Sequence, residues 1–196
     1  MRPPAALVLA LALLAAPGVP AAESAAGSSE LDQLMQLLAQ RRHGRVSFTE
    51  VQHLAVLDQP LRSSGELLYD APDRLEKRTL QPKPEDLVLD HGTLIMQRGT
   101  HRRVLSLSDT PQAVPLVESV RATLAGDRKA LEQYFALHLS GSLESWTLEL
   151  IPRDATLRRS IEHIRIGGEH DAIRTVEIIQ RDGDSSLLSI GPELRP

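Results

Sequence analysis

Residues 63–81, SSGELLYDAPDRLEKRTLQ, have the pattern of two β-strands joined at a proline corner. Successive side chains of an extended chain point to opposite faces, so the apolar Leu67, Tyr69 and Leu75 share one face. The opposite face carries the charged residues Glu66, Asp70, Arg74, Glu76 and Arg78. A hairpin with one apolar face predicts a sheet whose apolar face packs against a core or encloses an apolar cavity.

The same alternation recurs along most of the chain and predicts about eleven strands. Before a helical insertion they lie within residues 45–54, 63–70, 74–81, 84–90, 92–99 and 101–108, and after it within 135–141, 144–152, 161–168, 172–180 and 185–191. Asp90-His91-Gly92 and Arg181-Asp182-Gly183-Asp184 are turn signals, the second with an Asp-Gly step that closes hairpins. Because these strands follow one another closely, an antiparallel meander is expected.

Helical spacing appears in two places. Ser29 to Asp32 resembles a capping box and predicts a helix over 30–43 that Gly44 ends. The basic cluster Arg41-Arg42-His43 then either complements the helix dipole or forms a binding site. In the insertion, a stripe of Leu116, Val117, Val120 and Leu124 predicts one short helix, and Asp127 is placed to cap a second.

These elements predict a mainly β fold with α-helices (α+β), because eleven antiparallel strands in one sheet tend to curl, split or close. We expect an incomplete β-barrel covered by helices. Its concave face is predicted to carry the ligand-binding side chains Val46, Phe48, Leu67, Tyr69, Leu75, Leu87, Leu89, Leu94, Met96, Leu116, Val120, Leu137, Trp146, Leu148 and Leu150. The alternative is that the helices fill this face completely and leave an ordinary core.

The N-terminal residues 1–22 have the order of a secretory signal peptide: a basic Arg2, an apolar run from Ala5 to Ala16, then small residues. We expect cleavage after Ala21 or Ala22, with an uncleaved membrane anchor as the alternative, and one domain over 23–196. The formal charge is -4, or one unit more negative without Arg2, so nucleic-acid binding is not expected. The absence of cysteine excludes disulfides and thiolate chemistry.

Signals for catalysis are poor. The seven histidines have no metal-ligand spacing, and no glycine-rich phosphate loop or Gly-x-Ser-x-Gly nucleophile motif is present. The sequence therefore predicts no enzyme, no metal and no cofactor, and a hydrolase of lipid esters is the disfavoured alternative. Asp182-Gly183-Asp184 is interpreted as a hairpin turn rather than a calcium site.

Four pieces of the sequence resemble the periplasmic lipoprotein carrier LolA and its relatives. They are Ser47-Phe48-Thr49-Glu50, the strand from Gly65 to Pro72 followed by Leu75, the Gln81-Pro82 exit, and the hairpin from Leu87 to Leu94. The family commonly has glutamine where this chain has Glu50, and the best-known carriers have arginine where it has Ala71. We therefore identify it as similar to a divergent LolA-like member.

The resemblance implies an incomplete barrel whose helices form a lid over a cavity for acyl chains. The leading hypothesis is a periplasmic carrier of lipid, glycolipid or lipoprotein cargo, passing from an inner-membrane donor to an outer-membrane acceptor. Such a carrier would be a monomer after signal-peptide cleavage and would touch membranes only transiently. The alternative is a sensor or adaptor of the same fold, with Arg102-Arg103 and Arg158-Arg159 as candidate contacts for a protein partner.

Overall fold

The computed structural model describes residues 22–194, with side chains from residue 29 onward. Its helices are α1 (Ala22–Leu38), the 3-10 turn η1 (Leu107–Asp109), α2 (Val114–Leu124), α3 (Arg128–Tyr134) and α4 (Leu157–Ser160). Its strands are β1 (His43–His53), β2 (Leu61–Asp70), β3 (Arg74–Gln81), β4 (Glu85–Asp90), β5 (Thr93–Arg98), β6 (His101–Ser106), β7 (Phe135–Ser142), β8 (Ser145–Pro152), β9 (Ile161–Glu169), β10 (Ala172–Gln180) and β11 (Ser185–Glu193). The predicted signal peptide lies outside the described residues except for Ala22.

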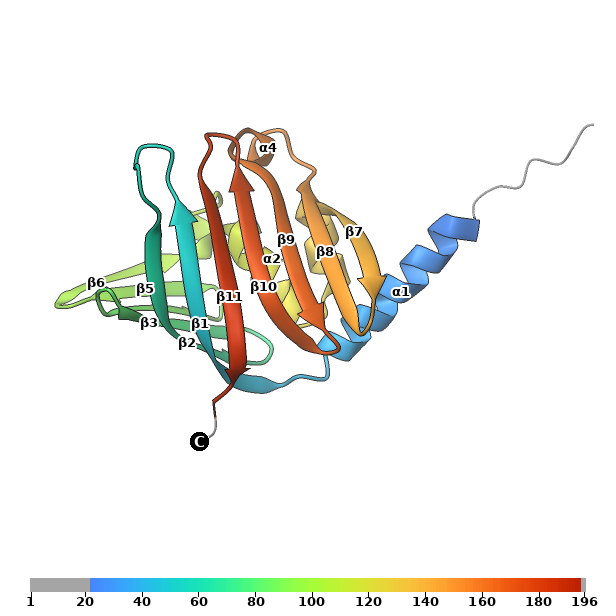
Figure 1. Ribbon diagram of the computed structural model, residues 1–196, viewed down its shortest axis with the longest axis horizontal. Coiled ribbons are helices and arrows are strands. Elements are labelled where there is room, and N and C mark those ends of the chain that lie inside the picture. The colour runs from blue at the N-terminus through green and yellow to red at the C-terminus, as the bar shows by residue number, and fades with distance from the viewer. Residues whose placement is uncertain (1–21, 195–196) are drawn as a thin grey trace, which may run out of the picture.

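All eleven strands form one antiparallel sheet in the order β6-β5-β4-β3-β2-β1-β11-β10-β9-β8-β7. The order consists of two meanders that meet where β1 pairs with β11. The sheet is curved and does not close, with β6 and β7 as its edges (Figure 1). The predicted fold class, an α+β half-barrel of about eleven strands with helices over it, is confirmed.

The register of the opening hairpin follows from its sequence. Tyr69 lies opposite Leu75, and Glu66 lies opposite Arg78, so the apolar and charged faces separate as predicted. Ala71, Pro72 and Asp73 form the turn, and the peptide bond before Pro72 is cis. The next hairpin turns at His91 and Gly92, which have positive φ angles of 47° and 75°. Tight hairpin turns require such angles, and glycine adopts them without strain.

The prediction for the first helix was wrong at both ends. The helix begins at Ala22 rather than Glu30, and the added residues include three alanines, which favour a helix. It ends at Leu38. The backbone N–H groups of Gln40 and Arg41 donate to carbonyls three residues earlier instead of four, and Gly44 is already paired in the sheet. Arg41 therefore does not cap the helix and instead forms an ion pair with Asp171 at 2.8 Å.

The helices cover the concave face unevenly, and α2 lies behind the sheet in Figure 1. One contiguous core joins α1 and α3 to strands β7–β10, and its fully buried side chains include Leu34, Leu38, Leu131, Phe135, Leu148, Leu150, Ile164 and Ile166. Full burial of each such side chain stabilises the fold by about 1.5–3 kcal/mol. Strands β1–β6 have no comparable helical cover, so the two halves of the concave face differ.

The turn between α2 and α3 sets the position of the lid. Gly126 has a φ of 64°, and a Cβ atom there would collide with the backbone oxygen of Met35 on α1. Asp127 then caps α3 as predicted, accepting a hydrogen bond from the Ala130 N–H at 3.0 Å. Close backbone contact at Gly126 thus ties the helical insertion to the first helix.

Candidate functional site: an apolar cavity beneath the lid

A cavity of about 560 Å³ lies between α2 and the concave face of the sheet, mainly over strands β1–β5 and β11. Its sheet side is built from inward residues of β1–β5, β10 and β11. Its lid side is built from four residues of α2, namely Leu116, Val117, Val120 and Leu124. The volume falls within the roughly 300–1,000 Å³ typical of ligand cavities, and the wall is mostly leucine, isoleucine and valine.

The structure brings nine of the fifteen predicted ligand-binding residues together around this cavity. They are Val46, Leu67, Tyr69, Leu75, Leu87, Leu89, Leu94, Leu116 and Val120. Alternation along strands β1–β5 places the first seven on the same face, and the α2 stripe faces them. Their ligand-binding role stays a prediction.

The other six predicted residues lie elsewhere. Trp146, Leu148 and Leu150 belong to the core under α1 and α3, and Leu137 packs against it. Phe48 is buried, with the Lys77 ammonium 5.2 Å from its ring centre. Met96 lies on β5 outside the cavity wall. The concave face is therefore a packed core at one end and a cavity at the other.

Several cavity residues were missed by the sequence analysis. Ile173, Val176 and Ile178 come from β10, and Leu188 and Ile190 come from β11. Their alternation was visible in the sequence, since both segments were predicted as strands. The pairing of β11 with β1 could not be read from the pattern, because the two strands are far apart in the sequence. This pairing brings β10 and β11 to the same cavity as Val46.

A charged cluster interrupts the apolar wall. Glu50 on β1 accepts hydrogen bonds from the Lys77 ammonium at 2.6 Å, the Ser63 hydroxyl at 3.1 Å and the Ser186 hydroxyl at 3.0 Å. These four residues come from four neighbouring strands, β3, β2, β1 and β11. Glu50, Lys77 and Ser186 all line the cavity.

Local sequence explains how Lys77 reaches Glu50 across strand β2. Gly65 occupies the inward position of β2 between Ser63, which pairs with Glu50, and Leu67, which pairs with Lys77. Without a side chain at Gly65, the lysine stem has room to cross this strand. A Cβ atom at Gly65 would also collide with the backbone oxygen of Arg78, so the close approach of β2 and β3 requires glycine.

The environment of Glu50 favours its charged form. Burial alone would raise the pKa of this carboxyl, but the hydrogen bond and charge of Lys77, with further hydrogen bonds from Gln52 and Ser186, bring the pKa below its ordinary value. The Glu50 side chain is only 9% exposed. The Glu50–Lys77 pair therefore has no net charge but is strongly polar, in a cavity wall that is otherwise mostly apolar.

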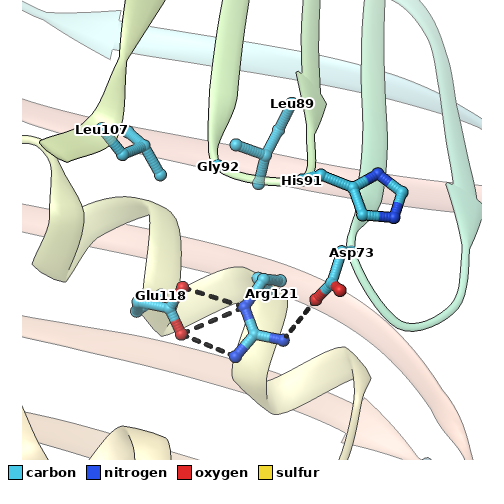
Figure 2. Close-up of a pocket in the computed structure, with 7 residues that line it drawn as sticks. All are labelled: Asp73, Leu89, His91, Gly92, Leu107, Glu118 and Arg121. Carbon is cyan, nitrogen blue, oxygen red and sulfur yellow. Dashed lines mark hydrogen bonds and ion pairs between the residues drawn. The ribbon is translucent and has the colours of Figure 1, made fainter.

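A second, smaller pocket of about 440 Å³ lies at the rim between the lid and the hairpin turns (Figure 2). There Arg121 of α2 donates to Glu118 at 2.7 Å and to Asp73 in the β2–β3 turn at 3.1 Å. The hydrogen bond that Arg121 donates to Glu118 is the main cause of the raised pKa of Arg121, so this side chain stays charged. This contact joins the lid to the barrel rim beside Ala71.

Tyr69 is a cavity residue with an unusual environment. Its side chain is 6% exposed, and its buried hydroxyl has no hydrogen-bond partner among the described residues. Burial raises the pKa of the phenol above its ordinary value. An unpartnered buried hydroxyl costs about 1–3 kcal/mol of stability.

Within residues 22–194, no group of three or more His, Asp and Glu side chains is arranged to hold a metal ion. No helix in this described part of the chain is long and apolar enough to cross a membrane.

The model of one family, described as outer membrane lipoprotein carrier protein LolA-like, matches residues 22–191. The chain belongs to this LolA-like family. The match extends from the first residue of α1 nearly to the end of β11, so the LolA-like protein uses almost all of its described residues for the family fold. No curated protein sequence matches it.

Three solved structures are similar to this LolA-like chain in architecture. A LolA superfamily protein from Nitrosomonas europaea has 11% identity and a TM-score of 0.44, covering 87% of this chain and 94% of its own. A putative outer membrane lipoprotein-sorting protein domain from Vibrio parahaemolyticus has 9% identity and a TM-score of 0.45, covering 84% and 90%. MucB, which forms a complex with MucA in Pseudomonas aeruginosa, has 16% identity and a TM-score of 0.48; the match covers 88% of this chain and 59% of MucB.

Proposed function

We propose that this protein is a periplasmic carrier that shelters acyl chains in its half-barrel cavity and moves them between membranes without chemistry. The observation that carries the proposal is the 560 Å³ apolar cavity beneath α2, in a molecule whose other concave half is well packed. Each methylene removed from water contributes about 0.8 kcal/mol. An acyl chain in the cavity would therefore supply the apolar contacts that the lid leaves unmade along the cavity wall.

The way the lid is held favours reversible binding. On its inner side, α2 places four apolar residues against the cavity, and on its outer side Arg121 contacts Asp73. Ion pairs at a partly exposed rim contribute about 1 kcal/mol or less. The Arg121–Asp73 contact therefore restrains the lid only weakly, as suits a carrier that must release its cargo.

The cargo and route are part of the proposal. We propose that the cargo is a lipid, a glycolipid or the acyl group of a lipoprotein, taken from an inner-membrane donor and passed to an outer-membrane acceptor. The protein acts as a monomer in the periplasm and touches membranes only during transfer. Membership of the LolA-like family supports this assignment.

The test is native mass spectrometry of the protein purified from a periplasmic extract, followed by organic extraction of anything released. We expect a lipid at near one-to-one stoichiometry. The variant Leu188→Glu places a charge in the cavity and should lose the lipid. The variant Leu187→Glu is its matched control: Leu187 is the exposed neighbour of Leu188 on β11, so this variant should keep the lipid. A bare wild-type polypeptide that also ignores added acyl probes would contradict the carrier function.

A second candidate function is an adaptor that binds a protein partner, and one surface favours it. Arg102 and Arg103 lie on the edge strand β6 with no ion pair among the described residues, next to Val104 and Leu105, which are 54% and 38% exposed. An exposed strand edge with apolar side chains is a site for strand addition. A pulldown abolished by Arg102→Glu/Arg103→Glu with lipid uptake intact would support the adaptor.

A further inference from the structure

The charged cluster in the cavity wall has hydrogen-bonding capacity that its own members do not use. Both oxygens of Glu50 are occupied, since Lys77 and Ser63 donate to one and Ser186 to the other. A lysine ammonium carries three N–H donors. Glu50 is the one hydrogen-bond acceptor of the Lys77 ammonium among the described residues, and the ammonium also lies over the aromatic face of Phe48.

The unused donors of Lys77 are accessible from the cavity. The Lys77 side chain is 27% exposed, against 9% for Glu50, and both residues form part of the cavity wall. Inward neighbours of Lys77 on the adjacent strands are Leu67 and Leu87, which offer no side-chain acceptor. A ligand in the cavity would therefore bring the acceptor that completes the ammonium's hydrogen bonds.

The charge of the cluster selects the kind of acceptor. Glu50 and Lys77 together are formally neutral, and their ion pair is 2.6 Å long. Arg41 and Arg174 also line the cavity, but they are already paired with Asp171 and Glu169. A carboxylate or phosphate bound at Lys77 would therefore add a net negative charge beside Glu50 in a mostly apolar cavity, where an unpaired charge is expensive. A neutral carbonyl accepts the same N–H without adding charge.

We propose that the cavity recognises acyl esters, with Lys77 donating to the ester carbonyl and Glu50 holding the Lys77 ammonium in place. This inference rests on the proposed carrier function and specifies its ligand class. Lys77 and Glu50 are then specificity-determining residues, while the leucines and isoleucines around them bind the hydrocarbon chain. Free fatty acids, which carry a carboxylate at neutral pH, are disfavoured.

Three ligands with chains of the same length test the inference: methyl laurate, laurate and dodecane, each displacing a fluorescent apolar probe from the cavity. We expect the wild-type protein to bind methyl laurate at least tenfold more tightly than either of the others. The double variant Glu50→Leu/Lys77→Met removes the ammonium donor without leaving an unpaired buried charge or adding a new donor, so it should fold. It should lose about tenfold in affinity for methyl laurate and keep its affinity for dodecane.

Lys83→Met is the matched control, because Lys83 is exposed in the β3–β4 loop and should behave as wild type. Thermal unfolding of all variants checks that they are folded. Equal wild-type affinity for methyl laurate and dodecane, tighter binding of laurate, or an unaffected double variant would each overturn the ester inference and leave the carrier function standing. Failure of the wild type to bind any of the three would overturn the carrier function, and the inference with it.

Discussion

Arg121 of the lid helix and Asp73 of the β2–β3 turn form an ion pair of 3.1 Å across the rim of the half-barrel. The pair lies beside Ala71, at the corner where the best-known carriers have an arginine. In this chain the positive charge is on the lid and the negative charge is on the corner. The lid and the rim are thus joined by a charged contact, with Glu118 orienting the arginine by accepting three further hydrogen bonds from it.

Asp73→Asn should weaken this contact and speed exchange through the lid. The Arg121–Glu118 pair remains, and Asp73 is 37% exposed, so the free energy of unfolding should fall by only about 0.5–1 kcal/mol. Stopped-flow uptake and release of an apolar fluorescent probe should both become faster. Asp86→Asn, at an exposed pair with Arg78 on the opposite face of the sheet, is the control; equal rates in both variants would show that the rim contact does not restrain the lid.

Lys77→Met should destabilise the protein most at neutral pH. In the wild type the pKa of Glu50 lies below its ordinary value near 4.5, so its contribution to stability is present above that pH and is lost as pH falls through the folded-state pKa. Without Lys77, burial raises the pKa of Glu50, and the buried carboxylate destabilises the folded state until it is protonated. Loss of the pair should lower the free energy of unfolding by about 2–3 kcal/mol near pH 7.

The sign of the pH dependence is the test. The difference in unfolding free energy between wild type and Lys77→Met should shrink as the pH falls from about 7 to about 5, measured by urea denaturation. Glu50→Leu/Lys77→Met should show little of this dependence, because it has no buried carboxyl at position 50. A difference that stays constant or widens on acidification would mean that Glu50 does not depend on Lys77.

Leu148→Ala and Leu67→Ala should separate core from cavity. Leu148 is fully buried under the helices, and its truncation should cost about 3 kcal/mol with little direct effect on a ligand. Leu67 lines the cavity and is only half-buried, so its truncation should cost about 1 kcal/mol or less and weaken binding of an alkyl probe. Equal losses of stability in both variants would place Leu67 in a filled core.

Gly126→Ala should loosen the helical insertion. The residue has a positive φ, and its Cβ would collide with backbone of α1, so strain and steric overlap add. We expect a loss of about 2–3 kcal/mol in thermal or urea unfolding. Gly99→Ala is matched, since Gly99 has a φ of 58° with open space around it, and should lose only about 1 kcal/mol. Similar losses of stability in both variants would show that the overlap with the Met35 backbone contributes nothing at Gly126.

The sequence by itself determined the strands, their turns and the separation of faces. Alternation is a local property, so Tyr69 and Leu75 were assigned to one face correctly, and the Asp-Gly turn at residues 182–183 joined β10 to β11 as predicted. Helix ends were less readable: the pattern predicts that Gly44 stops α1, but Gly44 already lies within β1.

Only the tertiary structure decided which part of the concave face is core and which is cavity. Leu67 and Leu148 have the same alternating pattern, and their difference comes from where α1 and α3 pack against β7–β10. The Glu50–Lys77 contact also depends on the fold, because residues 27 positions apart meet only when β1, β2 and β3 pair in register and Gly65 leaves space between them. Periodicity records which face a side chain occupies, while the packing of distant elements determines what lies against that face.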